Sequence, residues 1–195
     1  MGNHEYDNGT ANAAFDYFGS AAGPRGLGYY SFDLGEWHVI VLNDNLSISA
    51  GSTEDQWLQG DLAANTKLCT LAIWHGPLFY SSTNTTTTQS AYRNFWNRLY
   101  AAGAELVLNG HRHHYERFAL QTPSGARDPV RGIREFIVGT GGRSLDPPST
   151  IRANSEVHSA TYGVIKLTLH ADSYTWEFIP IAGQSFRDAG SGTCH

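Results

Sequence analysis

The chain has 195 residues, of which 41% are hydrophobic and 16% are charged. This balance is typical of one globular domain spanning residues 1–195 and excludes a disordered or fibrous chain. No apolar run is long enough to span a membrane, and the first residues do not resemble a signal peptide. The net charge of −5, with no basic run, argues against nucleic acid as a structural partner. Nine histidines beside only two lysines direct attention to metal chemistry.

Strand and helix signals alternate over the first two thirds of the chain, and the last third is mostly strand. β-Prone or apolar runs bounded by turn signals predict strands at 29–34, 37–42, 68–74, 105–108, 115–121, 133–138, 162–170 and 174–181. Apolar residues at helical spacing predict one helix at about 54–64, after a capping box that begins at Thr53, and another from Tyr92 up to Gly103. The later strands are expected to be antiparallel. Residues 81–88 are expected to be a mobile surface loop, and 146–161 a long loop.

Histidines directly follow two of the expected buried strands. His75 comes after 68–74, and His111 comes after 105–108. Because α/β sheets place ligand sites beyond the carboxyl ends of their strands, both imidazoles are expected at one edge of the sheet. His113 lies two residues beyond His111, so the pair can face a common point or two adjacent metal ions. Imidazole, amide oxygen and carboxylate donors suit Zn, Fe or Mn better than Mg or Ca.

Three segments carry this chemistry: Gly2-Asn3-His4-Glu5, Trp74-His75-Gly76-Pro77 and the run from Gly110 to Arg117. In this order they resemble the calcineurin-like metallophosphoesterase family, in its purple acid phosphatase-like branch. The similarity continues through residues 132–142. It implies an α/β fold of the layered β-sandwich type. It also implies that Asn3, His75 and His111 bind one metal ion and that His113 binds its neighbour. The resemblance places His4 beside the metal, where its imidazole contacts a phosphoryl oxygen or protonates the leaving group.

The sequence departs from the family pattern at its amino terminus. In the family, aspartate-containing segments precede Gly-Asn-His, whereas only Met1 precedes Gly2 here. The resemblance therefore implies an amino-terminally truncated domain that lacks about half of the family's metal ligands. Asp7 and Asp44 are the nearest candidate replacements, although both are more simply interpreted as surface residues.

The expected function is a metal-dependent hydrolase of phosphoesters, either a phosphomonoesterase or a phosphodiesterase, with one or two transition metal ions (Zn, Fe or Mn) and a small-molecule ester substrate. A mononuclear-metal esterase that acts on carboxylic or other acyl esters is one alternative. A catalytically inactive metal-binding fragment is another. Uncovered sheet edges predict a homo-oligomer, and no membrane partner is expected. The resemblance suggests a secreted or periplasmic protein. Cys69 and Cys194 either pair or stay free.

Overall fold

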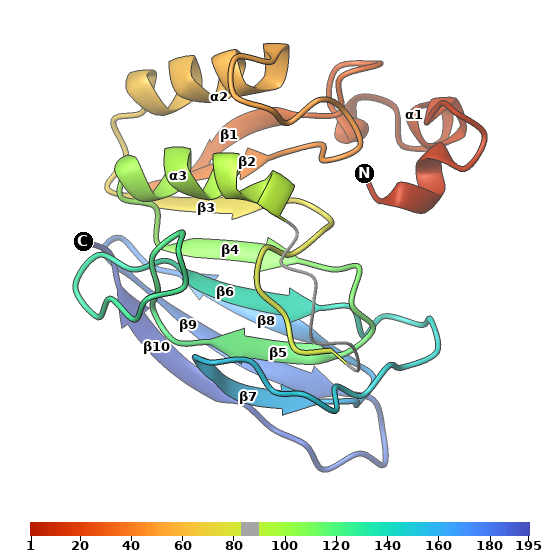
Figure 1. Cartoon of the computed structure of the whole chain (residues 1–195), viewed down its shortest axis with the longest axis vertical. Helices are drawn as coiled ribbons and strands as arrows, with labels where there is room; N and C mark the ends of the chain where they lie inside the picture. The colour runs from red at the N-terminus through yellow and green to blue at the C-terminus, as the bar shows by residue number, and fades with distance from the viewer. Residues whose placement is uncertain (83–89) are drawn as a thin grey trace.

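Ten strands form two sheets within residues 1–82 and 90–195, the part of the chain that this computed structural model describes (Figure 1). The larger sheet has the order β1-β2-β3-β4-β6-β5-β7, and the smaller has the order β10-β9-β8. The strands are β1 Tyr30–Leu34, β2 Trp37–Val41, β3 Cys69–Ile73, β4 Leu106–Asn109, β5 Tyr115–Phe118, β6 Arg134–Val138, β7 Ser155–Ser159, β8 Gly163–Leu169, β9 Ser173–Pro180 and β10 Ala189–Thr193. β2, β3, β4 and β6 are parallel, so their carboxyl ends share one edge of the sheet.

Helices and the small sheet cover opposite faces of the large sheet. The α-helices are α1 Asn12–Phe18, α2 Thr53–Ala64 and α3 Arg93–Ala101. Figure 1 shows α2 and α3 on one side of the large sheet, with β8, β9 and β10 on the other. Within the described residues, no helix combines the length and apolar character needed to cross a bilayer. The fold is therefore a layered α/β sandwich.

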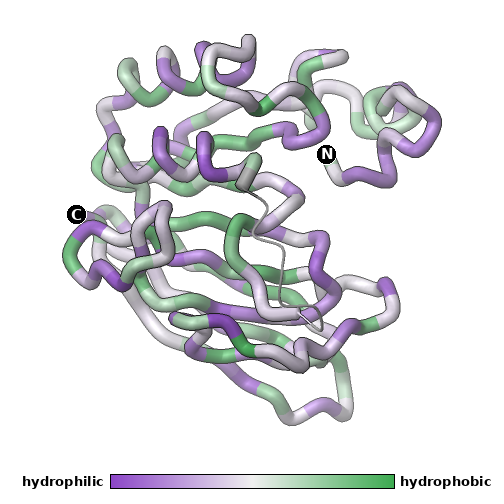
Figure 2. The backbone as a smooth tube through the Cα atoms, in the orientation of Figure 1, coloured by the Kyte–Doolittle hydropathy of each residue, from purple (hydrophilic) through white to green (hydrophobic). Residues whose placement is uncertain are grey.

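Each interface between layers has its own hydrophobic core. Leu58 of α2 and Trp96 of α3 pack with Ile40 and Val107 of the sheet, all fully buried. On the other face, Trp176 of the small sheet lies in a cluster of mainly aromatic side chains that also includes Trp37, Tyr115, Phe136 and Phe178. In Figure 2 the central strand β4 is mostly green, whereas α3 alternates green with purple, as expected of a half-exposed helix. The parallel strands are covered on both faces because they supply both cores.

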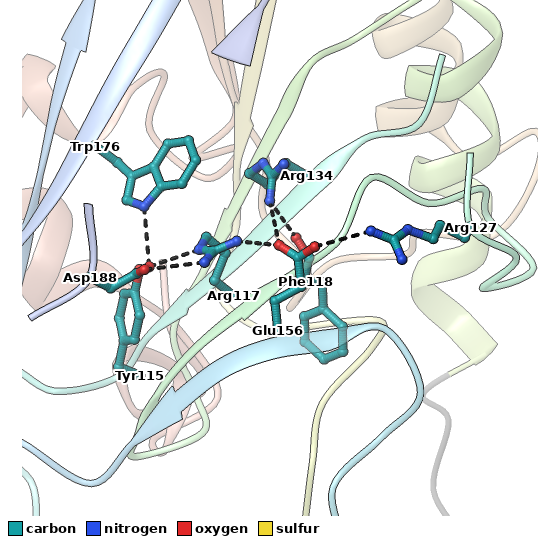
Figure 3. Close-up of polar contacts among 8 residues, drawn as sticks. All are labelled: Tyr115, Arg117, Phe118, Arg127, Arg134, Glu156, Trp176 and Asp188. Atoms are coloured by element: carbon teal, nitrogen blue, oxygen red, sulfur yellow. Dashed lines mark hydrogen bonds and ion pairs between the residues drawn. The ribbon is translucent and has the colours of Figure 1, made fainter. Parts of the chain in front are cut away.

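A largely buried polar network joins the two sheets (Figure 3). Asp188 accepts hydrogen bonds from the Tyr115 hydroxyl at 2.7 Å, Arg117 Nε at 2.8 Å and Trp176 Nε1 at 3.1 Å. Arg117 also pairs with Glu156 of β7. Because buried charges are costly unless they are paired, this network is best understood as structural.

The Cys69–Cys194 pair forms a disulfide bond, which settles the alternative that the sequence left open. Cys69 is the first residue of β3 and is fully buried. Cys194 lies just after β10, so the bond fastens the carboxyl-terminal tail to the large sheet. The two residues are separated by 125 positions in the chain.

Most of the expected elements are present, and four details of the expectation were wrong. Residues 155–159 form strand β7 inside the expected long loop. The amino-terminal cap of α2 is Ser52, whose hydroxyl accepts from the Asp55 N–H, rather than Thr53. Helix α1 and strand β10 were not predicted. The expected loop at 81–88 lies largely outside the described residues.

Candidate metal centre

The candidate site lies where the parallel strands β3 and β4 end. His75 follows β3 after one intervening residue, and His111 follows β4 after Gly110. The Gly110 N–H donates to the His75 carbonyl at 2.9 Å, which joins the two strand ends. Asn3 reaches the same place from the 3-10 helix Asn3–Tyr6. Three distant segments of the chain therefore meet at the edge predicted from the sequence.

Three donor atoms converge there. Asn3 Oδ1 lies 2.8 Å from His75 Nε2 and 3.4 Å from His111 Nδ1. The two nitrogens are 3.2 Å apart, and the imidazole rings are nearly perpendicular, at 80°. We call these three residues the donor triad. Its atoms form a small triangle in which every member comes from a different segment of the chain.

His111 has a backbone conformation that side-chain-bearing residues seldom adopt. Its φ angle is +62°, in the left-handed region. On its amino-terminal side the Gly110 carbonyl accepts the Arg112 N–H at 2.6 Å, which closes a tight turn around His111. Non-glycine residues with positive φ cluster at functional sites because the surrounding structure must hold them there. The turn brings His111 Nδ1 to the other two donors.

Burial lowers the pKa of both imidazoles in the donor triad. The Asp44 and Glu5 charges partly oppose this effect at His75, and the neighbouring His75 adds to it at His111. Both rings are therefore neutral at pH 7, which is the form in which imidazole binds metal ions. The chemistry of the donor set thus fits a transition metal ion.

The distances support the same conclusion. Metal–nitrogen and metal–oxygen bonds of about 2.0 to 2.2 Å place neighbouring ligand atoms roughly 3 to 3.5 Å apart. The triad separations of 2.8 to 3.4 Å lie close to this range. No three His, Cys, Asp or Glu side chains within the described ranges gather as a metal site, so the third donor is the Asn3 amide.

The other two predicted site residues line a cavity of about 420 Å³ beside the triad. His113 borders this cavity, and its ring makes no hydrogen bond to any described residue. His4 borders it too and is 74% exposed, with its Nδ1 atom 3.0 Å from Asp7 Oδ2. The structure therefore brings all five predicted residues to one cavity, but only three of them are in mutual contact.

Asp44 lies closer to the site than the sequence suggested. It is half-buried, and its Oδ2 atom accepts the Gly76 N–H at 2.7 Å, next to His75. Tyr92 hydrogen-bonds to Asp44, and burial together with this charge raises the pKa of the Tyr92 hydroxyl. Interpreting Asp44 as a surface residue was therefore wrong. Asp7, by contrast, is exposed, and its carboxylate contacts His4.

Two carboxylates and one histidine near the triad have other partners. Glu116 hydrogen-bonds to His114 at 3.2 Å and to the Ser81 N–H at 2.8 Å. His114 is buried and also contacts the Asp146 carbonyl, so it does not extend the donor triad. Glu5 Oε2 accepts the Gly2 N–H at 2.6 Å, which fixes the start of the chain beside His75.

Arg143 also lines the cavity, and the sequence reasoning missed it. Its only signal in the sequence was its place in the glycine-rich turn after β6, which could have been a plain turn. Its position relative to His4 and His113 depends on the folded structure.

Comparison with known proteins identifies several related sequences. No family model matches the chain. It is 30% identical over 152 residues to purple acid phosphatase 15 of Arabidopsis thaliana, covering 72% of this chain and 28% of that protein. It is 28% identical over 184 residues to an uncharacterized protein of Mycobacterium tuberculosis, covering 73% of this chain and 34% of that one. The chain therefore spans about a third of the length of these relatives.

The solved structures agree on the fold. The purple acid phosphatase PPD1 of yellow lupin superimposes with a TM-score of 0.75 over 88% of this chain and 34% of that chain, at 19% identity. The inner membrane complex anchor of Plasmodium superimposes with a TM-score of 0.63 at 12% identity. The named relatives, the ordered histidine segments and the layered sandwich together support a calcineurin-like metallophosphoesterase of the purple acid phosphatase-like branch.

Proposed function

We propose that this chain carries part of the active site of a metal-dependent phosphoester hydrolase. The observation that carries the proposal is the convergence of Asn3 Oδ1, His75 Nε2 and His111 Nδ1 within 3.4 Å of one another. Neutral imidazoles and an amide carbonyl provide three donors without negative charge. Such a set leaves a bound cation strongly electrophilic, as hydrolysis of an anionic ester requires.

The triad would hold one ion of Zn, Fe or Mn, and His113 would contribute to binding a second. When bound, such ions lower the pKa of water and stabilise the charge that develops on the phosphoryl oxygens. The chain's own side chains perform the other steps of the reaction. They bind the ester in the adjacent cavity and orient it, and they supply the proton for its leaving group.

His4 is the residue proposed to supply that proton. Asp7 accepts a hydrogen bond from its Nδ1–H, which leaves Nε2 as the atom that exchanges a proton in the cavity. A protonated Nε2–H can donate to a phosphoryl oxygen or to the departing alkoxide.

The disulfide supports export from the cytosol. Disulfide bonds persist in oxidising compartments and are rare in the reducing cytosol. Cys69 and Cys194 are joined, so a secreted or periplasmic location is proposed for the protein. Fractionation of the native host with thiol trapping tests this location.

The function is tested by metal analysis together with a panel of esters. The chain is loaded separately with Zn, Fe or Mn and dialysed, and the metal per chain is measured with turnover of a phosphomonoester, a phosphodiester and a carboxylic ester. We expect tightly bound metal and phosphoester turnover. His75→Ala and His111→Ala should lose both, because a small donor set cannot lose a ligand and keep its affinity.

The matched control is His158→Ala, which removes an exposed imidazole from the β7 edge strand. It should keep the full metal content and turnover. Full metal content in His75→Ala or His111→Ala would contradict the assignment of the triad. Turnover of the carboxylic ester alone would favour the acyl esterase, and metal binding without any turnover would favour an inactive metal-binding chain.

A further inference from the structure

The loop that follows β6 is fixed against the histidine segment at both of its ends. The Gly139 N–H donates to the His114 carbonyl at 3.2 Å, and the Asp146 N–H donates to the His113 carbonyl at 2.9 Å. A side chain at Gly139 would place its Cβ 1.9 Å from the Arg112 carbonyl oxygen, so only glycine permits this close approach. Residues between these two anchors therefore have a defined place beside the candidate site.

Arg143 lies within this loop and lines the same cavity as His4 and His113. The sequence contains eleven arginines. Within residues 1–82 and 90–195, ten of them have a hydrogen bond, an ion pair or an aromatic ring as partner: Arg25, Arg93, Arg98, Arg112, Arg117, Arg127, Arg131, Arg134, Arg152 and Arg187. Arg143 is the exception, because no described residue pairs with its guanidinium.

The cavity is suited to an anion on two further grounds. Among the described residues, its lining includes four histidines and Arg143 but no aspartate or glutamate. A guanidinium presents a planar fork of N–H donors that matches two phosphate oxygens, and such charge-assisted pairs are among the strongest hydrogen bonds in proteins. An unpaired arginine at the edge of such a cavity is therefore free to bind an incoming phosphoryl group.

We propose that Arg143 binds the outer oxygens of the substrate's phosphoryl group and makes the site selective for phosphomonoesters over phosphodiesters. The inference rests on the proposed function. A monoester has three unesterified oxygens and two negative charges, whereas a diester has two such oxygens and one charge. After one oxygen faces the donor triad, only the monoester offers two more to the guanidinium fork. Arg143 is thus a specificity-determining residue.

Binding measurements with two matched ligands test this assignment. Methyl phosphate and dimethyl phosphate differ by one methyl group and one charge at about pH 8, and their dissociation constants for the metal-loaded chain are measured by calorimetry. The wild-type chain should bind methyl phosphate more tightly. Arg143→Ala should weaken methyl phosphate binding by about 10- to 100-fold, the scale of a lost charge-assisted pair, and change dimethyl phosphate binding less than about threefold.

Two further variants separate geometry from net charge. Arg143→Lys keeps the charge and loses the fork, so its affinity for methyl phosphate should be intermediate. Arg187→Ala removes an exposed arginine from the loop between β9 and β10, where it donates to nearby backbone carbonyls, and should bind as the wild type does. Metal per chain is measured in every variant and should not change.

The outcomes distinguish this inference from the proposed function. Equal loss of both ligands in Arg143→Ala, no loss of either, or a wild-type chain that binds neither would overturn the role of Arg143. A wild-type chain that binds methyl phosphate through Arg143 but hydrolyses no ester would contradict the proposed function and support the role of Arg143.

Discussion

The carboxylate of Asp44 accepts the backbone N–H of Gly76 at 2.7 Å, and this bond ties the loop after β2 to the residue that follows His75. Asp44 therefore acts on the donor triad without belonging to it. A Cβ at Gly76 would lie 2.2 Å from the Tyr92 hydroxyl and 2.8 Å from Asp44 Oδ2, so the three residues are closely packed. Such contacts hold His75, a proposed metal ligand, in place.

Asp44→Ala should weaken metal binding by about 10- to 100-fold, as is usual when a group that positions a ligand is removed. Asp44→Asn keeps an oxygen acceptor for the Gly76 N–H and should lose less. Competition with a chromogenic chelator measures both affinities. Asp172→Ala, an exposed change near the β8–β9 turn, is the control. Equal metal affinities of Asp44→Ala and wild type would show that metal binding does not depend on the hydrogen bond between Asp44 and Gly76.

His4→Ala should keep the metal and lower kcat by roughly 10²- to 10⁴-fold, because it removes a general acid rather than a ligand. Steady-state kinetics on a phosphomonoester with a poor leaving group measures the loss. An ester whose leaving group departs without protonation should show a smaller decrease. If His4→Ala slows both esters equally, the imidazole binds the phosphoryl group instead of protonating the leaving group.

Stability should fall in acid because of the Asp55–Arg98 pair between α2 and α3. The Arg98 hydrogen bond lowers the pKa of Asp55 to about 2, and the side chain is fully buried. A carboxyl group whose folded pKa lies below its unfolded value stabilises the fold above about pH 4, and this contribution is lost as the pH falls toward 2. This contribution to the free energy of unfolding is about 2 kcal/mol.

Urea titrations of the wild type and Asp55→Asn between about pH 2 and pH 6 measure this contribution. The variant should be less stable near pH 6, and the difference should shrink as the pH falls. A difference that stays constant over this range would show that Arg98 does not depress the pKa of Asp55.

Loss of the disulfide should lower the free energy of unfolding by about 2 to 5 kcal/mol, because the bond closes a long loop. Thermal unfolding of Cys69→Ala/Cys194→Ala is compared with that of the wild type, with and without dithiothreitol. The reductant should lower the melting temperature of the wild type only. An unchanged wild-type melting temperature under full reduction would show that the tail is held by packing alone.

We propose that the chain self-associates, most simply as a twofold dimer. Val41, Ile73, Leu108 and Val138 line one face of a cavity of about 330 Å³ near the carboxyl ends of their strands, and each is only half-buried. This apolar row is only partly covered, and partly exposed apolar rows favour association. Sedimentation at micromolar concentration should give a dimer, and Leu108→Glu should give more monomer. A folded wild-type monomer would contradict this proposal.

Much of the fold and of the site could be predicted because the patterns that indicate them lie within short stretches of the sequence. Buried parallel strands appear as unbroken apolar runs, and the residues directly after them must lie at one sheet edge. That geometry placed His75 and His111 together. β7 was missed because Ser155–Ser159 is an edge strand with half-exposed and exposed side chains, so no hydrophobic alternation marks it.

Contacts between distant segments could not be predicted in the same way. Asp44 reaches Gly76 because β2 and β3 pair in parallel register, with Val41 opposite Ile73, and no pattern near Asp44 encodes that pairing. Arg143 reaches the cavity only because its loop is anchored to His113 and His114. Both residues depend on strand pairing across tens of residues, and short motifs do not contain this information.

The positive φ angle of His111 is unfavourable for folding, although it brings the Nδ1 atom to the other two donors. Glycine adopts such a φ angle freely, so His111→Gly should relax the turn while it deletes one of the three donors. A library of variants screened only for heat resistance would therefore drift away from histidine at this position, whereas a screen for metal retention would keep it. The proposed metal centre thus owes one of its donor nitrogens to a residue that folding alone would not select.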